Sequence, residues 1–148
     1  MSSIIKNRQA RFNYEILDTY EAGIALTGSE VKSLRGGNVQ LSDAYGIVKD
    51  GEAFLVGVHI SPYTFARAGG HEPDRTRRLL LHKKEIERIG ARLGKERLTM
   101  VPLSLYFKNG KVKVELGIGK GKTRYDKRET IKKRDQKREI DRAIRDRR

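Results

Sequence analysis

The chain has 148 residues, which suits one compact domain with some extension. Hydrophobic residues make up only 36% of it and charged residues 35%, while the absence of Cys excludes disulfides, thiolate metal sites and a Cys nucleophile. The formal net charge of +14 predicts a polyanionic partner, above all nucleic acid, because neutralising phosphates releases their counterions.

A membrane fits the sequence less well than nucleic acid does. The first eight residues hold no apolar run of signal-peptide length, and no stretch of the chain is apolar enough to span a membrane. A basic helix on an anionic membrane would need Trp, Phe or Leu on one face, and the basic end of this chain lacks them. We therefore expect a cytoplasmic protein without membrane contact.

The body of the chain predicts mainly β-structure. β-rich or alternating segments indicate strands at 14–20, 23–26, 44–49, 52–60, 101–107 and 112–118. Asp50-Gly51 and Asn109-Gly110 are strong hairpin-turn signals. Pro102 is expected at an edge or a bulge, because it cannot donate a ladder hydrogen bond.

Helices are expected at 29–34 and at 82–93, each followed by glycine. Residues 61–78 read as a long loop with a basic end, and loops of this length are often functional. About six strands with two or three short helices predict a small closed β-barrel, because closure removes exposed sheet edges.

The last 29 residues differ from the rest. Residues 120–148 carry 14 Lys+Arg against 6 Asp+Glu and contain no Leu, Val, Met or Phe. Such a segment buries too little apolar surface to offset its ordering entropy. The sequence therefore predicts an RNA-binding domain at 1–119 and a tail at 120–148 that is disordered alone and helical when bound.

No catalytic, metal or cofactor site is indicated, so we predict neither an enzyme nor a cofactor. The three His residues have no metal-ligand spacing. Gly121-Lys122-Thr123 resembles the end of a phosphate-binding P-loop, but Leu116 stands where that motif needs Gly, and no core helix follows. Residues 117–123 are either a flexible exit from the last strand or a hinge that touches RNA, and the surrounding charge favours the hinge.

Two basic clusters are candidates for RNA contact. Asn7–Tyr14 joins Arg8 and Arg11 to aromatic rings that can stack on unpaired bases, or it is a solvated arm with its rings in the core. Arg75–Leu81 ends in three consecutive Leu, which cannot all point inward from an extended segment. The residues alone leave open whether the triplet enters the core or one Leu meets an unstacked base.

Five stretches, in order along the chain, resemble the SsrA-binding protein family. They are Asn7-Arg8-x-Ala10-Arg11 with Tyr14, then 20–35, 50–55, 77–81 and 119–128. The resemblance implies a closed β-barrel with oligonucleotide-binding-fold character. It also implies binding to the tRNA-like part of transfer-messenger RNA (SsrA RNA) and its delivery to stalled ribosomes. There trans-translation tags the incomplete protein and releases the ribosome.

The resemblance extends to single residues. Asn7, Glu21 and Leu80 match positions that contact the D-arm region of the RNA; from the residues alone, Glu21 would be a turn acid satisfied by neighbouring N–H groups. With the basic residues of these stretches, the predicted RNA-binding set is Asn7, Arg8, Arg11, Glu21, Lys32, Arg35, Arg75, Arg77, Arg78, Leu80, Lys120 and Lys122.

Asp126-Lys127-Arg128 resembles the family's tail motif, which acts at the ribosomal decoding site and in the empty mRNA channel. Tyr125 replaces the commoner His, which keeps an aromatic face but loses titration near neutral pH. The predicted ribosome-contacting set is Tyr125, Asp126, Lys127, Arg128, Lys132, Lys133, Arg134, Lys137 and Arg138.

The resemblance further implies elongation factor Tu as a partner during delivery and a monomeric protein. The competing interpretation is a general RNA-binding translation factor or ribosomal protein of similar charge.

Overall fold

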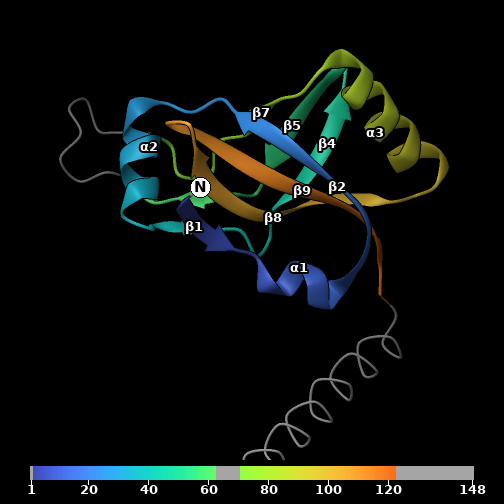
Figure 1. Cartoon of the computed structure of the whole chain (residues 1–148), viewed down its shortest axis with the longest axis horizontal. Coiled ribbons are helices and arrows are strands. Elements are labelled where there is room, and N and C mark those ends of the chain that lie inside the picture. The colour runs from blue at the N-terminus through green and yellow to red at the C-terminus, as the bar shows by residue number, and fades with distance from the viewer. Residues whose placement is uncertain (1, 63–70, 123–148) are drawn as a thin grey trace, which may run out of the picture.

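The computed structural model describes residues 2–62 and 71–122 and is mainly β, with nine strands and three helices among these residues (Figure 1). The helices are α1 (Arg8–Asn13), α2 (Gly28–Arg35) and α3 (Lys83–Lys95). The strands are β1 (Ser2–Lys6), β2 (Tyr14–Ile24), β3 (Val39–Gln40), β4 (Tyr45–Lys49), β5 (Glu52–Val56), β6 (His59–Ile60), β7 (Arg77–Leu80), β8 (Thr99–Lys108) and β9 (Lys111–Gly121).

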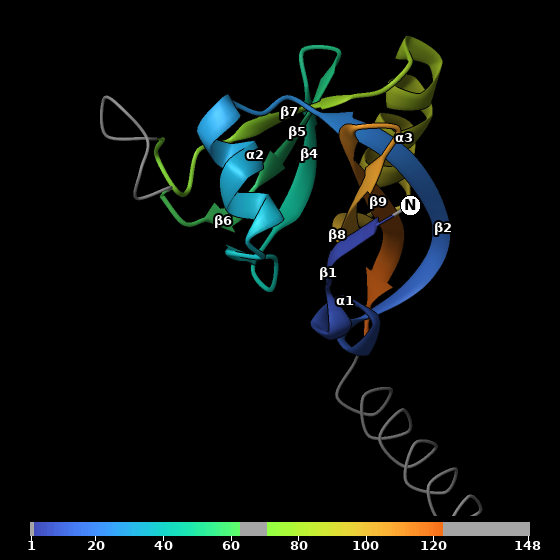
Figure 2. The ribbon, with the colours of Figure 1, turned by 60° about the vertical axis from the view of Figure 1, so that its left-hand side comes forward.

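Seven of these strands form one antiparallel sheet. Its order is β1-β8-β4-β5-β7-β2-β9, and β8 pairs additionally with β9, while β3 and β6 form a separate two-stranded sheet. Figure 2 shows the strong curvature of β2 and places α2 and α3 on different sides of the strands. The sequence-based prediction of a mainly β protein with short helices is confirmed.

Both predicted hairpin turns are present. Asp50 and Gly51 have φ of 53° and 76° between β4 and β5, and Asn109 and Gly110 have φ of 53° and 73° between β8 and β9. Two successive positive φ values define the tight turn that matches the twist of paired strands, and Asn-Gly and Asp-Gly adopt it readily. These two turns fix the register of both hairpins.

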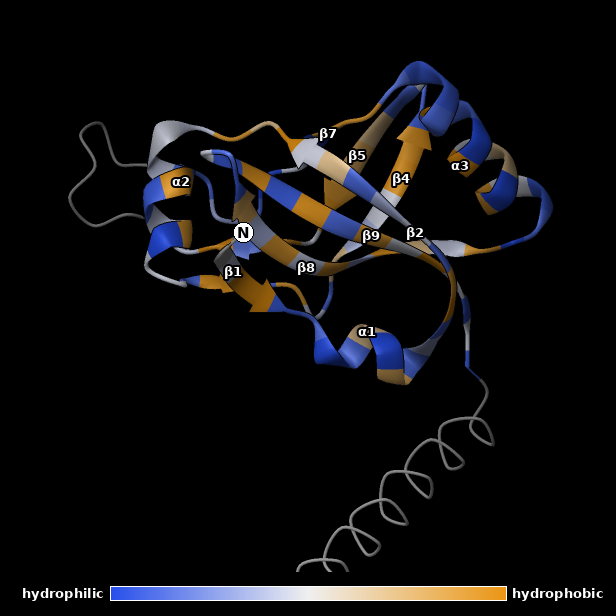
Figure 3. Cartoon of the chain, in the orientation of Figure 1, coloured by the Kyte–Doolittle hydropathy of each residue, from blue (hydrophilic) through white to orange (hydrophobic). Residues whose placement is uncertain are grey.

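The core lies inside the curved sheet. Along β9, buried residues alternate with more exposed ones from 111 to 116, and apolar and polar residues alternate visibly along this strand in Figure 3. β8 buries all of residues 100–103, because Val101 and Leu103 pack in a smaller second cluster with Ala10. α3 covers one side through Ile86 and Ile89, which are spaced three apart and buried. The fully buried side chains at its centre include Leu55, Ile60, Ile89, Met100, Leu116 and Ile118.

The structure departs from the predicted elements in several ways. Residues 14–24 form one strand rather than two, and the predicted strand 52–60 divides into β5 and β6 at residues 57–58. β7 begins within the predicted loop 61–78, and β1, β3 and α1 were not predicted at all. The predicted flexible exit or hinge is wrong for residues 117–121, because β9 continues to Gly121. A Cβ atom at Gly119 would lie 2.6 Å from the carbonyl oxygen of Glu15, so this glycine lets β2 approach closely.

Pro102 lies at an irregularity of β8, as predicted. The register of β8 against β9 shifts between Pro102 and Ser104. The carbonyl oxygen freed there accepts a hydrogen bond of 2.9 Å from the side-chain amide of Asn7. The same Asn7 caps α1 by accepting from the backbone N–H of Ala10 at 3.3 Å. The bulge therefore ties the start of α1 to the sheet.

A buried ion pair joins α2 to β7. Glu30 on α2 and Arg77 on β7 are both 0% exposed, and the Nε of Arg77 donates to Oε2 of Glu30. The other guanidinium nitrogens of Arg77 donate to the carbonyl oxygens of Val58, Arg75 and Pro73 at 2.8, 2.8 and 3.0 Å. A buried charge needs such full pairing, because each unpaired polar group costs free energy.

The second carboxylate oxygen of Glu30 is also paired. It accepts from Arg75 at 2.6 Å and from the backbone N–H of Thr27 at 2.8 Å, which completes a capping box at the start of α2. Burial alone would raise the pKa of Glu30, but the hydrogen bonds from Arg75, Thr27 and Arg77 outweigh it and hold the pKa below its usual value. Glu30 therefore stabilises the fold as a carboxylate.

Replacing this carboxylate should destabilise the protein. Glu30→Gln leaves the guanidinium of Arg77 buried without its counter-charge, and we expect a loss of about 3–5 kcal/mol in the free energy of unfolding at pH 7. Urea titration measures it, with Glu87→Gln on the exposed face of α3 as a control expected to change by less than about 0.5 kcal/mol. A Glu30→Gln loss below about 1 kcal/mol would contradict the assignment.

The pH dependence of this variant should differ as well. The stabilisation from Glu30 is complete above the ordinary carboxyl pKa, about 4.5, and is lost as the pH falls through the lowered folded-state pKa. Glu30→Gln should therefore lose less stability than the wild type on acidification from pH 5 to about 3.

Contact between β4 and β8 depends on a glycine. Gly46 faces Met100 in the one register pair that joins these strands among the described residues, and a Cβ at Gly46 would lie 2.9 Å from Cγ of Met100. We expect Gly46→Val to cost about 1–3 kcal/mol through overpacking. Gly94→Ala on α3 is the control, because a Cβ added at Gly94 would meet no packed neighbour within 4 Å. It should raise the free energy of unfolding by about 0.5–1 kcal/mol, because Ala has a higher helix propensity than Gly. Equal unfolding midpoints for both variants would contradict the prediction.

Candidate nucleic-acid interface

A hollow of about 750 Å³ opens where β2, β7 and the start of α3 meet the turn between β4 and β5. Its lining mixes apolar, basic and acidic side chains, among them Glu21, Glu52, Arg78, Leu80, Lys83 and Lys113. The size suits a nucleotide, and the cations can neutralise phosphates. Glu21, Arg78 and Leu80 belong to the predicted RNA-binding set, so the structure brings three of those residues together.

The Leu triplet divides as a strand requires. Leu79 on β7 is 2% exposed and belongs to the core, while Leu80 is 51% exposed. Leu80 lies opposite Gly23 of β2, where a Cβ would be only 3.2 Å from the Leu80 Cβ. Because Gly23 has no side chain, Leu80 packs directly against the backbone of β2 while its own side chain stays exposed. An apolar group held this way can lie against the face of an unstacked base.

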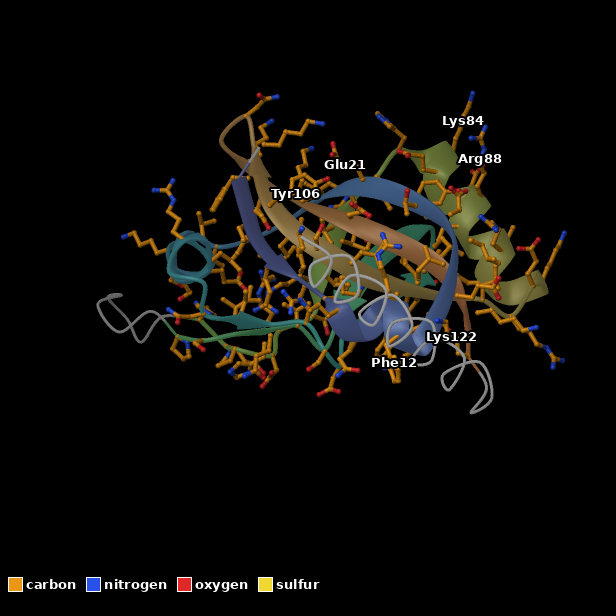
Figure 4. The ribbon with its side chains drawn as sticks, turned by 60° about the horizontal axis from the view of Figure 1, so that its bottom comes forward. Phe12, Glu21, Lys84, Arg88, Tyr106 and Lys122 are labelled. Atoms are coloured by element: carbon orange, nitrogen blue, oxygen red, sulfur yellow. The ribbon has the colours of Figure 1, made fainter. Side chains whose placement is uncertain are left out.

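Glu21 projects from β2 toward side chains of β8 (Figure 4). Its Oε2 accepts from the hydroxyl of Tyr106 at 2.5 Å, and its Oε1 accepts from Nζ of Lys108 at 3.1 Å. These hydrogen bonds lower the pKa of Glu21, and the bond from Tyr106 has the largest effect. Burial and the bond to Glu21 raise the pKa of Tyr106, which stays protonated as the donor. Glu21 is thus a strand residue with side-chain partners, and not a turn acid.

A second hollow, of about 290 Å³, adjoins α1 and is lined by Lys6, Asn7, Arg8, Arg11, Leu103, Ser104 and Glu115. Arg8 and Arg11 are exposed, and Arg11 lies 3.6 Å from Glu115. Glu115 on β9 faces Glu21 on β2, so the two hollows flank the same pair of strands. The structure thus places the N-terminal basic cluster beside the hollow of Leu80.

Asn7 contributes indirectly to this surface. It is 8% exposed, and its amide donates to the carbonyl oxygens of Leu41 and Pro102 at 3.2 and 2.9 Å. With both amide donors used inside the protein, the described role of Asn7 is to fix the start of α1. It thereby positions Arg8 and Arg11 at the surface.

The prediction that Arg77 binds RNA is wrong. The side chain expected to bind RNA is wholly buried and paired with Glu30, so it is unavailable to a ligand. Arg75 is half-buried, and its guanidinium bonds to Glu30 and to the carbonyl oxygen of Ala25. The sequence held one hint of this cluster: Thr27 followed three residues later by Glu30 is a capping-box pattern that places the acid at a helix start.

The remaining predicted residues lie away from the hollow of Leu80. On α2, Lys32 and Arg35 are exposed, and the Arg35 guanidinium lies 5.9 Å from the ring centroid of Phe107. Lys120 is exposed near the end of β9, and the backbone N–H of Lys122 donates to the carbonyl oxygen of Asn13 at 2.8 Å. Their assignment to RNA stays a prediction.

Two cations of the hollow were missed by the sequence analysis. Lys83 and Lys113 line it but were not among the predicted residues. The period-two pattern of residues 112–118 marked Lys113 as a surface position, yet no local signal says which neighbour it faces. The predicted tail residues, namely Tyr125, Asp126, Lys127, Arg128, Lys132, Lys133, Arg134, Lys137 and Arg138, lie outside the described residues.

The described segments contain neither a membrane-spanning helix nor a cluster of metal-ligating side chains. No helix within 2–62 and 71–122 combines the length and apolarity that crossing a membrane requires. In the same segments, no group of three or more His, Asp or Glu residues is placed to hold a metal ion.

Comparison with known proteins gives a consistent picture. The family model described as SmpB protein matches residues 4–146. The SsrA-binding protein of Trichodesmium erythraeum is 56% identical over 144 residues, which span 95% of this chain and 91% of that protein. The SsrA-binding protein of Ligilactobacillus salivarius is 52% identical over 97% of this chain and 92% of its own length.

A solved structure agrees with the sequence comparisons. It is described as "tmRNA-SmpB: a journey to the center of the bacterial ribosome" and superposes with a TM-score of 0.70 at 44% identity. The match covers 88% of this chain and 95% of that one. Since the family model spans nearly the whole chain and the relatives share half of its residues, the chain belongs to the SmpB family of SsrA-binding proteins.

Proposed function

We propose that this protein binds the tRNA-like domain of transfer-messenger RNA and delivers it to stalled ribosomes for trans-translation. The observation that carries the proposal is the hollow in which an exposed Leu80 lies beside the Glu21 carboxylate and the cations of Arg78, Lys83 and Lys113. Membership of the SsrA-binding family, and a similar solved structure described as tmRNA-SmpB, support this reading.

The chemistry of the hollow suits a folded RNA with unstacked bases. Cations pair with phosphates, which sets affinity, while an apolar side chain and an acceptor distinguish a splayed base from a paired one. A tRNA-like elbow offers both a compact backbone and loop bases outside a helix. Recognition of shape therefore fits this surface better than a base-by-base code.

The sheet is proposed to close into a barrel of oligonucleotide-binding-fold character. Pairing runs from β8 through β4, β5, β7, β2 and β9 and returns to β8, which supports closure. The β4–β8 junction rests on the pair Gly46–Met100. Closure would leave the outer face of β2, β9 and β8 as a rigid platform for RNA.

The segment predicted at 120–148 is proposed to act separately from the body only beyond Lys122, because Lys120 and Gly121 belong to β9 and the backbone of Lys122 is bonded to Asn13. Its basic composition suits ribosomal RNA at the decoding site and in the empty mRNA channel, with Tyr125 and Asp126-Lys127-Arg128 as the first contacts. Delivery with elongation factor Tu, action as a monomer and a cytoplasmic location belong to the same proposal, by resemblance to the family.

The rival function is a general RNA-binding translation factor. It predicts little preference among structured RNAs, whereas the proposed function predicts strong preference for transfer-messenger RNA. A competition gel shift against bulk tRNA at near-physiological salt separates the two, provided the salt concentration is fixed. Equal competition by tRNA would favour the rival.

The neighbouring leucines give a matched pair of variants. Leu80→Ala should weaken binding to the tRNA-like domain about tenfold through lost contact with the base, yet change the free energy of unfolding by less than about 0.5 kcal/mol. Leu79→Ala should cost about 2–5 kcal/mol of stability, because it empties a core position. Filter binding and urea titration measure both quantities. Unchanged RNA affinity in a folded Leu80→Ala protein would refute the site.

Truncation separates the two parts of the chain. Ending the protein after Lys122 should preserve binding to the tRNA-like domain, since every residue of both hollows remains. Tagging of incomplete proteins on stalled ribosomes should be abolished. A reconstituted tagging assay measures this, with the full chain as the control, and tagging by the truncated protein would overturn the proposed role of the tail.

A further inference from the structure

We propose that Tyr106 and Lys108 are positioning residues that make Glu21 a hydrogen-bond acceptor for a donor group of the bound RNA, a base N–H or a ribose 2′-hydroxyl. The inference rests on the proposed RNA-binding function and adds a chemistry to it. Neither Tyr106 nor Lys108 lies in the stretches that resemble the family, and both come from β8, two strands away from Glu21 in the run β2-β9-β8.

Within the part of the chain that the structure describes, the side chains around Glu21 leave its carboxylate one free acceptor position. A carboxylate offers about four lone-pair sites. The Tyr106 hydroxyl occupies one on Oε2 at 2.5 Å, and Nζ of Lys108 lies 3.1 Å from Oε1 and 3.3 Å from Oε2. Three directions are thus taken by the protein. The remaining one, on Oε1, belongs to a side chain that is 41% exposed at the hollow of Leu80.

The surrounding charges explain why such support is needed. Glu21 faces Glu115 directly across the β2–β9 pair, and like charges in that position repel. The hydrogen bonds draw the Glu21 carboxylate toward β8, while Arg11 pairs with Glu115 at 3.6 Å. Tyr106 and Lys108 on β8 therefore hold the Glu21 carboxylate on a surface whose basic side chains favour phosphate.

This arrangement selects what the RNA presents. An ionised carboxylate repels a phosphate, whose oxygens only accept hydrogen bonds, so phosphate groups are excluded from this point. A base amino or imino group, or a 2′-hydroxyl, can donate to Oε1. A charged acceptor that is already fixed loses little conformational entropy when the RNA binds. An RNA group that cannot donate a hydrogen bond would leave the Glu21 carboxylate unpaired.

The simpler alternative is an exposed ion pair with no effect on RNA. Surface pairs such as Lys108–Glu21 commonly contribute little to stability. That alternative predicts that loss of Tyr106 or Lys108 changes nothing beyond net charge. The hairpin provides the means to tell them apart, because Lys108 and Lys111 face each other across the turn and only Lys108 contacts Glu21 among the described residues.

The first test is a mutant cycle on binding of the tRNA-like half of transfer-messenger RNA at fixed salt. We expect Glu21→Gln to weaken binding about tenfold and Tyr106→Phe about threefold, with no further loss when the two are combined. Lys108→Gln should weaken binding more than Lys111→Gln, which removes the same charge. Equal effects of the two Lys variants, or additive losses in the double variant, would overturn the positioning role.

The second test is the pH profile of binding. Removing the Tyr106 hydroxyl should raise the pKa of Glu21, so the affinity of Tyr106→Phe should begin to fall at a higher pH than that of the wild type. A loss of packing alone would lower affinity equally at every pH. The charged or titratable groups that contact Glu21, lie opposite it or line the hollow with it are Lys113 and Glu115 on β9, Lys108 and Tyr106 on β8, Arg78 on β7, His82 at the start of α3, Lys83 and Glu85 on α3, and Glu52 on β5.

The third test identifies the donor. RNAs with single 2′-deoxy substitutions, or with inosine in place of guanosine, are compared on the wild type and on Glu21→Gln. A substitution that weakens wild-type binding but is silent in Glu21→Gln marks the donor as sugar or base. If none is silent, the donor assignment fails.

The outcomes also separate this inference from the proposed function. If Glu21→Gln binds the RNA as tightly as the wild type does, Glu21 is not part of the interface. Weak binding by Glu21→Gln, with normal binding and an unchanged pH profile in Tyr106→Phe, would refute only the positioning role. Thermal melting of each variant confirms that the protein is folded.

Discussion

The buried pair of Glu30 and Arg77 is the constraint on which the arrangement of this surface depends. It joins α2 to β7, and the guanidinium also donates to three carbonyl oxygens, those of Val58, Pro73 and Arg75. β7 is thereby fixed in register against β2, where Leu80 meets Gly23. An uncompensated charge here would be costly, so the pair specifies one arrangement and excludes looser ones. The surface around Leu80 is therefore held in one arrangement.

Much of the fold was readable from local sequence because its signals are local. Asp50-Gly51 and Asn109-Gly110 fix two hairpins through backbone conformation alone, and the alternation that follows gives β8 and β9. β1 was missed for the opposite reason: it pairs with β8, a hundred residues away, and five residues carry too little pattern. The two-residue strand β3 is too short for a periodic signal, and β6 was predicted only as the end of one longer strand at 52–60.

The site was predicted where side-chain chemistry was unusual and missed where it depended on neighbours. Three consecutive Leu required one to be exposed, but only the register against Gly23 shows that it is Leu80. Arg77 looked like a phosphate ligand because Arg is seldom buried, and its partner Glu30 lies 47 positions earlier in the chain. Lys113 and the support of Glu21 by Tyr106 exist only once β2, β9 and β8 are side by side.

The long pairing of β2 with β9 fixes the spacing between two parts of the surface. It runs from Gly23–Lys113, at the hollow of Leu80, to Tyr14–Gly121, where the backbone of Lys122 is tied to Asn13. Nine residues at about 3.3 Å each place roughly 30 Å of paired strand between these points. If RNA occupies the hollow of Leu80, hydrogen-bonded backbone therefore fixes how far it lies from residue 122. A longer or shorter segment beyond that residue would change only how far the segment extends.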